Sequence, residues 1–87
     1  MNCLHSRVEL DDGDSIVVKL SGNEANVQVM SDSDFRNYQC GKNFSYLGGH
    51  YRRSPAIIRP PSGGWWNVVV DLGGGAGRVE AAISVIH

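Results

Sequence analysis

The chain has 87 residues, 41% of them hydrophobic, and a formal net charge of −1. This length suits one domain with one thin core, so we expect a single domain over residues 1–87. The small net charge gives no overall field that would select nucleic acid or an anionic membrane, and no stretch approaches the apolar length of a membrane-spanning helix. We therefore expect neither nucleic acid nor a membrane as the partner.

The charges are nevertheless sorted along the sequence. Residues 1–35 carry seven acidic and two basic side chains, whereas residues 36–70 carry five basic side chains and no acidic one. Chance in a small sample is one explanation. The alternative is a middle segment that faces an anion, or an acidic region that meets a basic region of a neighbouring subunit.

Cys3 and Cys40 are the two cysteines, which are too few for a disulfide framework, and the sequence has no N-terminal apolar run of signal-peptide form. We therefore expect free thiols in a reducing, cytoplasmic compartment. Neither cysteine lies in a CxxC motif or next to a histidine. We expect Cys40 to be a small buried residue rather than a reactive thiol.

Apolar residues alternate with polar ones over residues 4–10, 15–20 and 25–30, which predicts three strands. Residues 11–14 and 21–24 between them have turn composition. Three strands joined by such short turns predict a β-meander. The residues expected to share a face within the second and third strands are Ile16, Val18 and Leu20, and Val27 and Val29.

Residues 31–34 are rich in helix N-cap side chains. They predict one or two helical turns over residues 35–39, stopped by Gly41. The spacing of Phe35 and Tyr38 predicts one helix face pinned to the core, and we expect no longer helix.

The next segments have weaker strand patterns. Residues 44–47 predict a short strand that Gly48 and Gly49 break. Residues 56–59 are expected to be extended and to end at Pro60, because proline cannot donate a hydrogen bond to a neighbouring strand.

Residues 65–72 form the clearest strand, followed by a glycine-rich turn and a last strand over residues 78–86. The alternation places Trp66 with Val68 and Val70 on the core face and Trp65 on the opposite face. Trp65 is either part of a second core layer or a contact surface for a ligand or subunit, and we favour the contact surface. Seven short strands predict an all-β fold, a small β-sandwich or a flattened barrel.

The glycine run at residues 73–77 has the composition of a phosphate-binding loop, but its context does not fit one. No Gly-Lys-Ser/Thr follows, Arg78 stands where a dinucleotide fingerprint needs glycine, and a strand rather than a helix comes next. We therefore interpret residues 73–77 as a β-hairpin turn that needs positive φ angles.

Catalytic and metal-binding patterns are absent from the sequence. His5, His50 and His87 have no metal-ligand spacing to a cysteine, a histidine or a carboxylate. There is no nucleophile motif and no paired-carboxylate pattern. We expect a protein that is not an enzyme, with no catalytic residue, no metal and no cofactor.

The segment from Tyr46 to Arg53 is the best candidate for a binding site. Arginine forks suit phosphate or carboxylate, and aromatic rings suit a nucleobase. The alternative is a solvated loop with ordinary surface arginines. The predicted ligand-binding residues are Tyr46, His50, Tyr51, Arg52, Arg53 and Trp65.

Several motifs resemble an uncharacterised bacterial family of small β domains of unknown function. They are Tyr46-x-Gly48-Gly49, the block from Gly64 to Gly74 with its Trp-x-Val-Val-Val-Asp-Leu-Gly-Gly run, and the stretch from Leu20 to Val27. The resemblance covers nearly the whole chain, although Trp65 departs from the family pattern. Members of that family occur alone or fused ahead of Toll/interleukin-receptor-type (TIR) domains. Bacterial TIR domains often act in antiviral defence through nucleotide-derived signals, so the resemblance implies that a copy without an effector binds such a signal. In a virus it would act as a sponge that sequesters the signal.

Two classes of function follow. The first is a non-catalytic binder of a small anionic ligand such as a nucleotide, at a site shared between subunits of a homo-oligomer, because so short a chain has little depth for a pocket. The second is a protein-interaction or self-assembly module that accompanies TIR-type effectors and associates through exposed strand edges and opposite charges.

Overall fold

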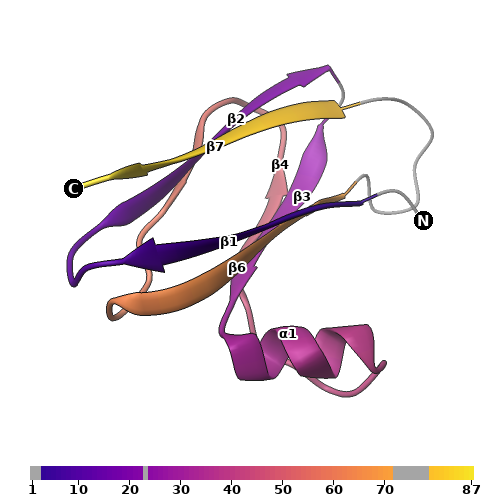
Figure 1. Cartoon of the computed structure of the whole chain (residues 1–87). Helices are drawn as coiled ribbons and strands as arrows, with labels where there is room; N and C mark the ends of the chain where they lie inside the picture. Colours follow the sequence, from indigo (N-terminus) through magenta and orange to yellow (C-terminus); the bar gives the residue numbers. More distant parts are fainter. Residues whose placement is uncertain (1–2, 23, 72–78) are drawn as a thin grey trace.

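The protein is a sandwich of two β-sheets with one short helix at one end (Figure 1). This computed structural model describes residues 3–22, 24–71 and 79–87. The elements in chain order are β1 (Cys3–Leu10), β2 (Ser15–Gly22), β3 (Ala25–Met30), α1 (Asp32–Gln39), β4 (Leu47–Tyr51), β5 (Ala56–Ile58), β6 (Gly64–Asp71) and β7 (Val79–Ile86). The predicted all-β class, with seven strands and one short helix, is confirmed for the described residues.

The strands form a four-stranded sheet A in the order β1-β6-β3-β4 and a three-stranded sheet B in the order β5-β2-β7, with antiparallel pairing throughout. The consecutive strands β1, β2 and β3 alternate between the sheets, so the predicted β-meander is wrong. Alternation determines which side chains share a face, but it does not determine which strand lies alongside. β3 pairs with β6, where Val27 lies opposite Val70 and Val29 opposite Val68.

The core lies between the sheets and consists mainly of β-branched side chains, which suit a pleated surface. Ile16 and Val18 of β2 are fully buried, and Leu20 packs partly buried against the same core. β7, an edge strand of sheet B, contributes alternate residues to this core. The facing side chains are Val27 and Val29 of β3, Val68 and Val70 of β6, and Ala81, Ile83 and Val85 of β7.

The glycines at 48 and 49 do not break a strand but lie within one. β4 spans Leu47–Tyr51 and pairs with β3 over its whole length, so the predicted strand over residues 44–47 is wrong. Gly48 has φ +105° and lies so close to β3 that an added Cβ would collide with the carbonyl oxygen of Val27. Only glycine fits this conformation at this distance, so Gly48, a residue typical of a turn, is required within strand β4.

The predicted helix forms, but it begins at Asp32, three residues earlier than expected, because the first of the N-cap residues is the one that caps it. Ser31 caps α1 by accepting a hydrogen bond from the backbone N–H of Asp34, and Gly41 follows the helix with φ +73°. The expectation that Phe35 and Tyr38 face the core is wrong, because no residue of α1 is buried. Their rings pack outside the sandwich, where Phe35 stacks on His5 at a centroid distance of 4.1 Å. Within the described part of the chain, no helix has the length and hydropathy to cross a membrane.

Cys40 is exposed, which corrects the expectation of a buried cysteine. It is the C-cap of α1, and its backbone N–H donates to the carbonyl oxygen of Arg36. Because α1 buries none of its residues, the residue that ends it has no core to enter.

The two faces of β6 carry the side chains that the sequence predicted for them. Trp66 packs against the core, whereas Trp65 lies on the opposite face of the strand with 46% of its surface exposed. The turn predicted for residues 73–77 lies outside the described residues.

Candidate functional site

The outer face of sheet A, which points away from the core, carries a connected set of polar side chains. We call them the Asn67 network: His5 and Arg7 of β1, Asp32 of α1, and Trp65 and Asn67 of β6. Asn67 is only 1% exposed although its side chain is polar. It accepts a hydrogen bond from Nε2 of His5 (2.9 Å) and donates from Nδ2 to Oδ1 of Asp32 (2.7 Å) and to the carbonyl oxygen of Met30 (3.4 Å). Both ends of the amide are therefore satisfied, as a buried polar group requires.

Arg7 completes the network at the surface. Its guanidinium donates to both carboxylate oxygens of Asp32, from Nε at 3.0 Å and from Nη2 at 2.7 Å, and it lies 4.0 Å from the ring centroid of Trp65. The Arg7 hydrogen bonds, followed by the one from Asn67, lower the pKa of Asp32 from 3.8 to about 2. Bidentate and cation–π contacts of this kind hold side chains in fixed positions. Since its polar groups are mutually satisfied, the network fastens α1 to the sheet and has little capacity left for a ligand.

A second polar cluster lies at the opposite end of the same face. Oδ1 of Asn26 accepts a hydrogen bond from Nδ1 of His50 (2.9 Å), and its Nδ2 donates to Asp71 (3.1 Å). Glu24 lies 3.2 Å from Nε2 of His50 and 3.5 Å from Nε of Arg52. These side chains are largely exposed, so their pairing contributes little stability and is easily exchanged for another partner.

Next to this cluster is a small hollow of about 80 Å³ between the end of β2 and the bend that follows β4. We call it the arginine pocket. Among the described residues, Arg53 has no hydrogen bond or ion pair, and Arg52 has only the long contact to Glu24. The lining includes Leu20, Glu24, Tyr51, Arg52, Arg53 and Ser54.

Four of the six predicted site residues lie together, and two lie apart. Tyr51, Arg52 and Arg53 line the arginine pocket, and His50 lies next to it, 3.2 Å from Glu24. Tyr46 precedes β4 and lies six residues before Arg52, about 20 Å away along an extended chain.

Trp65 is at the far end of β6 from the pocket. Asp71, six residues further along β6, pairs with Asn26, and Asn26 pairs with His50. Six residues of strand again correspond to about 20 Å. Trp65 therefore shares a sheet face with His50 but not a site.

Tyr46 instead lines a second hollow of about 180 Å³, between the start of α1 and the loop before β6. Its walls are mostly apolar and include Met30, Leu47, Pro61 and Trp66. The indole N–H of Trp66 donates to the carbonyl oxygen of Ser62 (3.0 Å). An apolar cavity of about 150 Å³ accommodates benzene, so this hollow has the size of a single ring or branched side chain.

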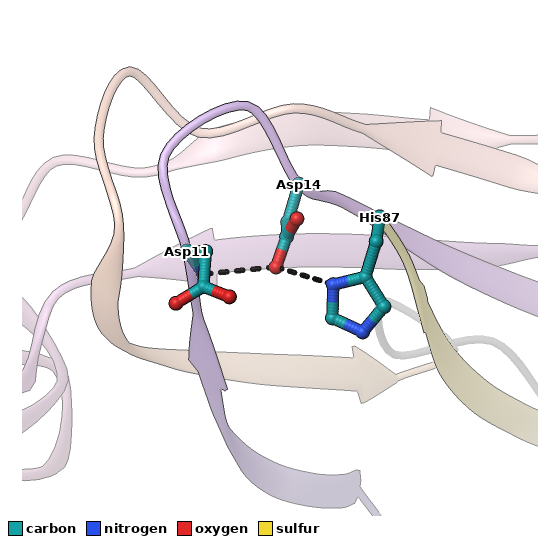
Figure 2. Close-up of side chains that lie close together, drawn as sticks. All are labelled: Asp11, Asp14 and His87. Atoms are coloured by element: carbon teal, nitrogen blue, oxygen red, sulfur yellow. Dashed lines mark hydrogen bonds and ion pairs between the residues drawn. The ribbon is translucent and has the colours of Figure 1, made fainter.

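A third group of side chains meets at the turn between β1 and β2 (Figure 2). Asp11 and Asp14 belong to this turn, and His87 arrives from the end of β7. Nδ1 of His87 donates to Oδ2 of Asp14 (3.0 Å), which also accepts the backbone N–H of Asp11 (2.8 Å). The backbone hydrogen bond is the first cause that lowers the pKa of Asp14 below 3.8.

Sequence reasoning missed this third group and the Asn67 network. His87 is 73 residues from Asp14, so no local spacing joins them. The alternation along β6 places Asn67 on the outer face, but nothing in the sequence identifies Asp32, 35 residues away, as its partner. The signal that was available is a polar residue next to the apolar run Val68-Val69-Val70.

Neither the search of curated proteins nor the search of solved structures found a match for this chain. A family model, described as a domain of unknown function (DUF1883), matches residues 1–87. The match spans both sheets, α1, the arginine pocket and the Asp11 turn. The chain therefore belongs to the family described as domain of unknown function DUF1883.

Proposed function

We propose that this domain is a non-catalytic binder of a small ligand that carries a phosphate or carboxylate group, held at the arginine pocket. The observation that carries the proposal is the guanidinium of Arg53, which has no partner among the described residues and lies beside Arg52 at the mouth of a hollow. A guanidinium presents a planar fork of donors that matches phosphate and carboxylate oxygens.

The surroundings add donors and an apolar wall. Oγ of Ser54 accepts the backbone N–H of Leu20 (2.8 Å), which leaves the hydroxyl proton free to donate to an anion. The rings and chains of Tyr51 and Leu20 form the less polar side. Glu24 is the competing anion for Arg52, so a ligand must displace a contact of 3.5 Å between exposed groups, which is weak.

The pocket is too small to enclose a whole ligand. About 80 Å³ holds one anionic group, well below the roughly 300–1,000 Å³ of pockets that enclose a whole small molecule. We propose that the remainder lies against a second copy of the chain in a cytoplasmic homo-oligomer. The resemblance to β domains fused ahead of TIR domains favours a nucleotide-derived immune signal as the ligand, with sequestration of that signal as the role of a copy without an effector.

The test is thermal unfolding against inorganic phosphate, mononucleotides, cyclic dinucleotides and ADP-ribose. A ligand at a hundredfold excess over its Kd stabilises the folded state by about 2.7 kcal/mol. The double variant Arg52→Ala/Arg53→Ala should lose the shift, whereas Arg36→Ala, at an exposed arginine on α1, should keep it. An unchanged shift in the double variant would show that the ligand binds elsewhere, and a ligand recovered cleaved would make the protein an enzyme.

The second candidate is a self-assembly or protein-interaction module, favoured by the outer face of sheet B. Ile57 of β5, which lies opposite Val17 of β2, is 58% exposed, and Ile86 of β7, which lies opposite Ser15 of β2, is 51% exposed. Exposed apolar side chains on neighbouring strands are typical of contact surfaces. Light scattering after size exclusion tests this candidate: Ile57→Asp should reduce the molar mass of any oligomer that forms without ligand. A monomer at every concentration would reject self-assembly, and a monomer that persists with ligand bound would also reject the shared site.

A further inference from the structure

The turn between β1 and β2, together with the end of β7, brings three metal-binding side chains to one point (Figure 2). This point lies at the start of β2, whereas the arginine pocket lies at its end. We propose that Asp11, Asp14 and His87 form a site for a divalent transition-metal ion of the zinc type. An imidazole nitrogen with carboxylate oxygens is a ligand set that zinc accepts, whereas magnesium and calcium prefer oxygen ligands alone.

The distances fit after a small adjustment of exposed side chains. One ligand atom from each of the three residues lies within 4.8 Å of the other two. Zinc binds nitrogen and oxygen at about 2.0–2.2 Å, so two of its ligands lie at most about 4 Å apart. The ligand atoms therefore need to move only slightly closer together. Asp11 and His87 can make this movement, because Asp11 is exposed and the side chain of His87 is 76% exposed.

Independent support comes from the burial of Asp14, which is only 5% exposed. Within the described part of the chain, no lysine or arginine forms an ion pair with it. Its one side-chain partner among the described residues is His87, which carries a charge only when protonated. A buried charge in a folded protein is generally paired or bound to a metal, and a divalent cation would supply the missing charge.

The buried carboxylate is already held in position. The backbone N–H of Asp11 donates to Oδ2 of Asp14, a contact that fixes a ligating oxygen as outer hydrogen bonds do in metal sites. His87 now donates from Nδ1 to the same oxygen. To bind the ion, the neutral ring presents Nδ1 as a lone pair with its proton on Nε2, so the hydrogen bond is replaced by two bonds to the metal. Three protein ligands leave a fourth position for water.

The site is separate from the arginine pocket. Asp14 immediately precedes β2, whereas Ser21, which lines the pocket, lies seven residues further along the extended chain, about 23 Å away. Loss of one kind of binding therefore does not remove the other, and the two proposals can fail independently.

The experiment is calorimetric titration of the full chain, without an affinity tag, with zinc chloride at neutral pH. We expect one equivalent to bind, and His87→Ala and Asp11→Asn, both at exposed positions, each to weaken binding at least tenfold. The matched control is Asp12→Asn in the same turn. Asp12 accepts a hydrogen bond from the backbone N–H of Gly63 (2.6 Å), a role that asparagine can keep. The affinity of the Asp12→Asn variant for zinc should therefore stay within twofold of that of the wild type.

The NMR spectrum of the His87 ring gives a second readout, since coordination at Nδ1 shifts its carbon and nitrogen signals. Saturable shifts at His87 with one equivalent of zinc support the site. Absence of binding, or equal weakening in Asp12→Asn and His87→Ala, overturns it, because equal weakening indicates only the general negative charge of the turn. Phosphate or nucleotide binding by His87→Ala should be unchanged in every case.

Discussion

Nδ2 of Asn67 on β6 donates a hydrogen bond to Oδ1 of Asp32, the first residue of α1, over 2.7 Å and across 35 positions of sequence. This contact places the start of the helix on the outer face of sheet A, away from the hydrophobic core. The position of α1 is thus set by polar contacts and ring stacking, because the helix buries none of its own residues. Such a helix depends on a few specific side chains rather than on a broad apolar face.

Replacing Asn67 with alanine should therefore be costly. The change removes three hydrogen bonds and leaves the carbonyl oxygen of Met30 without its side-chain donor in a buried place. Loss of a buried polar partner costs about 1–3 kcal/mol, and we expect a loss near the upper end of this range in the free energy of unfolding. Urea unfolding measures it, with Asn43→Ala as the exposed control, expected to change stability by less than about 0.5 kcal/mol. Equal effects of the two variants would contradict the role of Asn67.

Acid should weaken the same contact. The pKa of Asp32 is about 2 in the folded protein and 3.8 in its ordinary state, so the unfolded chain binds a proton more readily. The stability that Asp32 contributes is complete above about pH 4 and declines as the pH falls toward 2. The free energy of unfolding of the wild type should therefore fall more steeply between pH 4 and pH 2 than that of Asp32→Asn.

Urea unfolding at several pH values between 2 and 7 provides the comparison. Asparagine at position 32 keeps an oxygen that can accept from Asn67 but does not titrate, so the difference between the two curves isolates Asp32 from the other carboxylates. Parallel curves below pH 4 would show that Arg7 and Asn67 do not lower the pKa of this carboxyl group.

The adjacent tryptophans should differ in their effect on stability. Trp66 packs against the core and donates to the carbonyl oxygen of Ser62, so Trp66→Ala should cost about 3 kcal/mol. Trp65 is half exposed and contacts Arg7 through its ring, a contact worth about 0.5–1 kcal/mol at an exposed site. Thermal unfolding of the two variants should rank them in this order, and the opposite order would reverse the assigned faces of β6.

The faces of the strands could be predicted from the sequence because side chains alternate across a strand whatever its neighbours are. This is why alternation alone is enough to assign Ile16, Val18 and Val27 to the core side of their strands. The partner of each strand could not be predicted, because turn composition at residues 11–14 is equally compatible with a hairpin and with a crossing between sheets. In the structure the chain crosses from one sheet to the other at these residues.

In the candidate site, too, local groupings could be predicted from the sequence but contacts between distant segments could not. Residues 50–53 stay together because they are contiguous, so their grouping needs no knowledge of the fold. The separation of Tyr46 and Trp65 from them depends on the length and register of β4 and β6, which a local pattern does not determine. His87 meets Asp14 only because β7 lies beside β2 in sheet B.

The two glycines of β4 give the sharpest test of the fold. Gly48→Ala would place a Cβ against the carbonyl oxygen of Val27 at a φ of +105°, so both the backbone angle and the approach of β4 to β3 would have to change. We expect a loss of about 3 kcal/mol or more in the free energy of unfolding, by the combined cost of strain and lost pairing.

Gly49→Ala is the matched control one residue further along. Apart from its two chain neighbours, no atom of the described residues lies within 4 Å of its Cβ position, and its φ is not positive. The change should therefore leave stability within about 1 kcal/mol and can raise it by restricting the unfolded chain. Where Gly48→Ala fails to give soluble protein, hydrogen exchange of the Gly49→Ala variant still reports whether β3 and β4 remain paired. Similar losses in both variants would mean that flexibility of the glycine pair, rather than the close approach at Gly48, is what β4 requires.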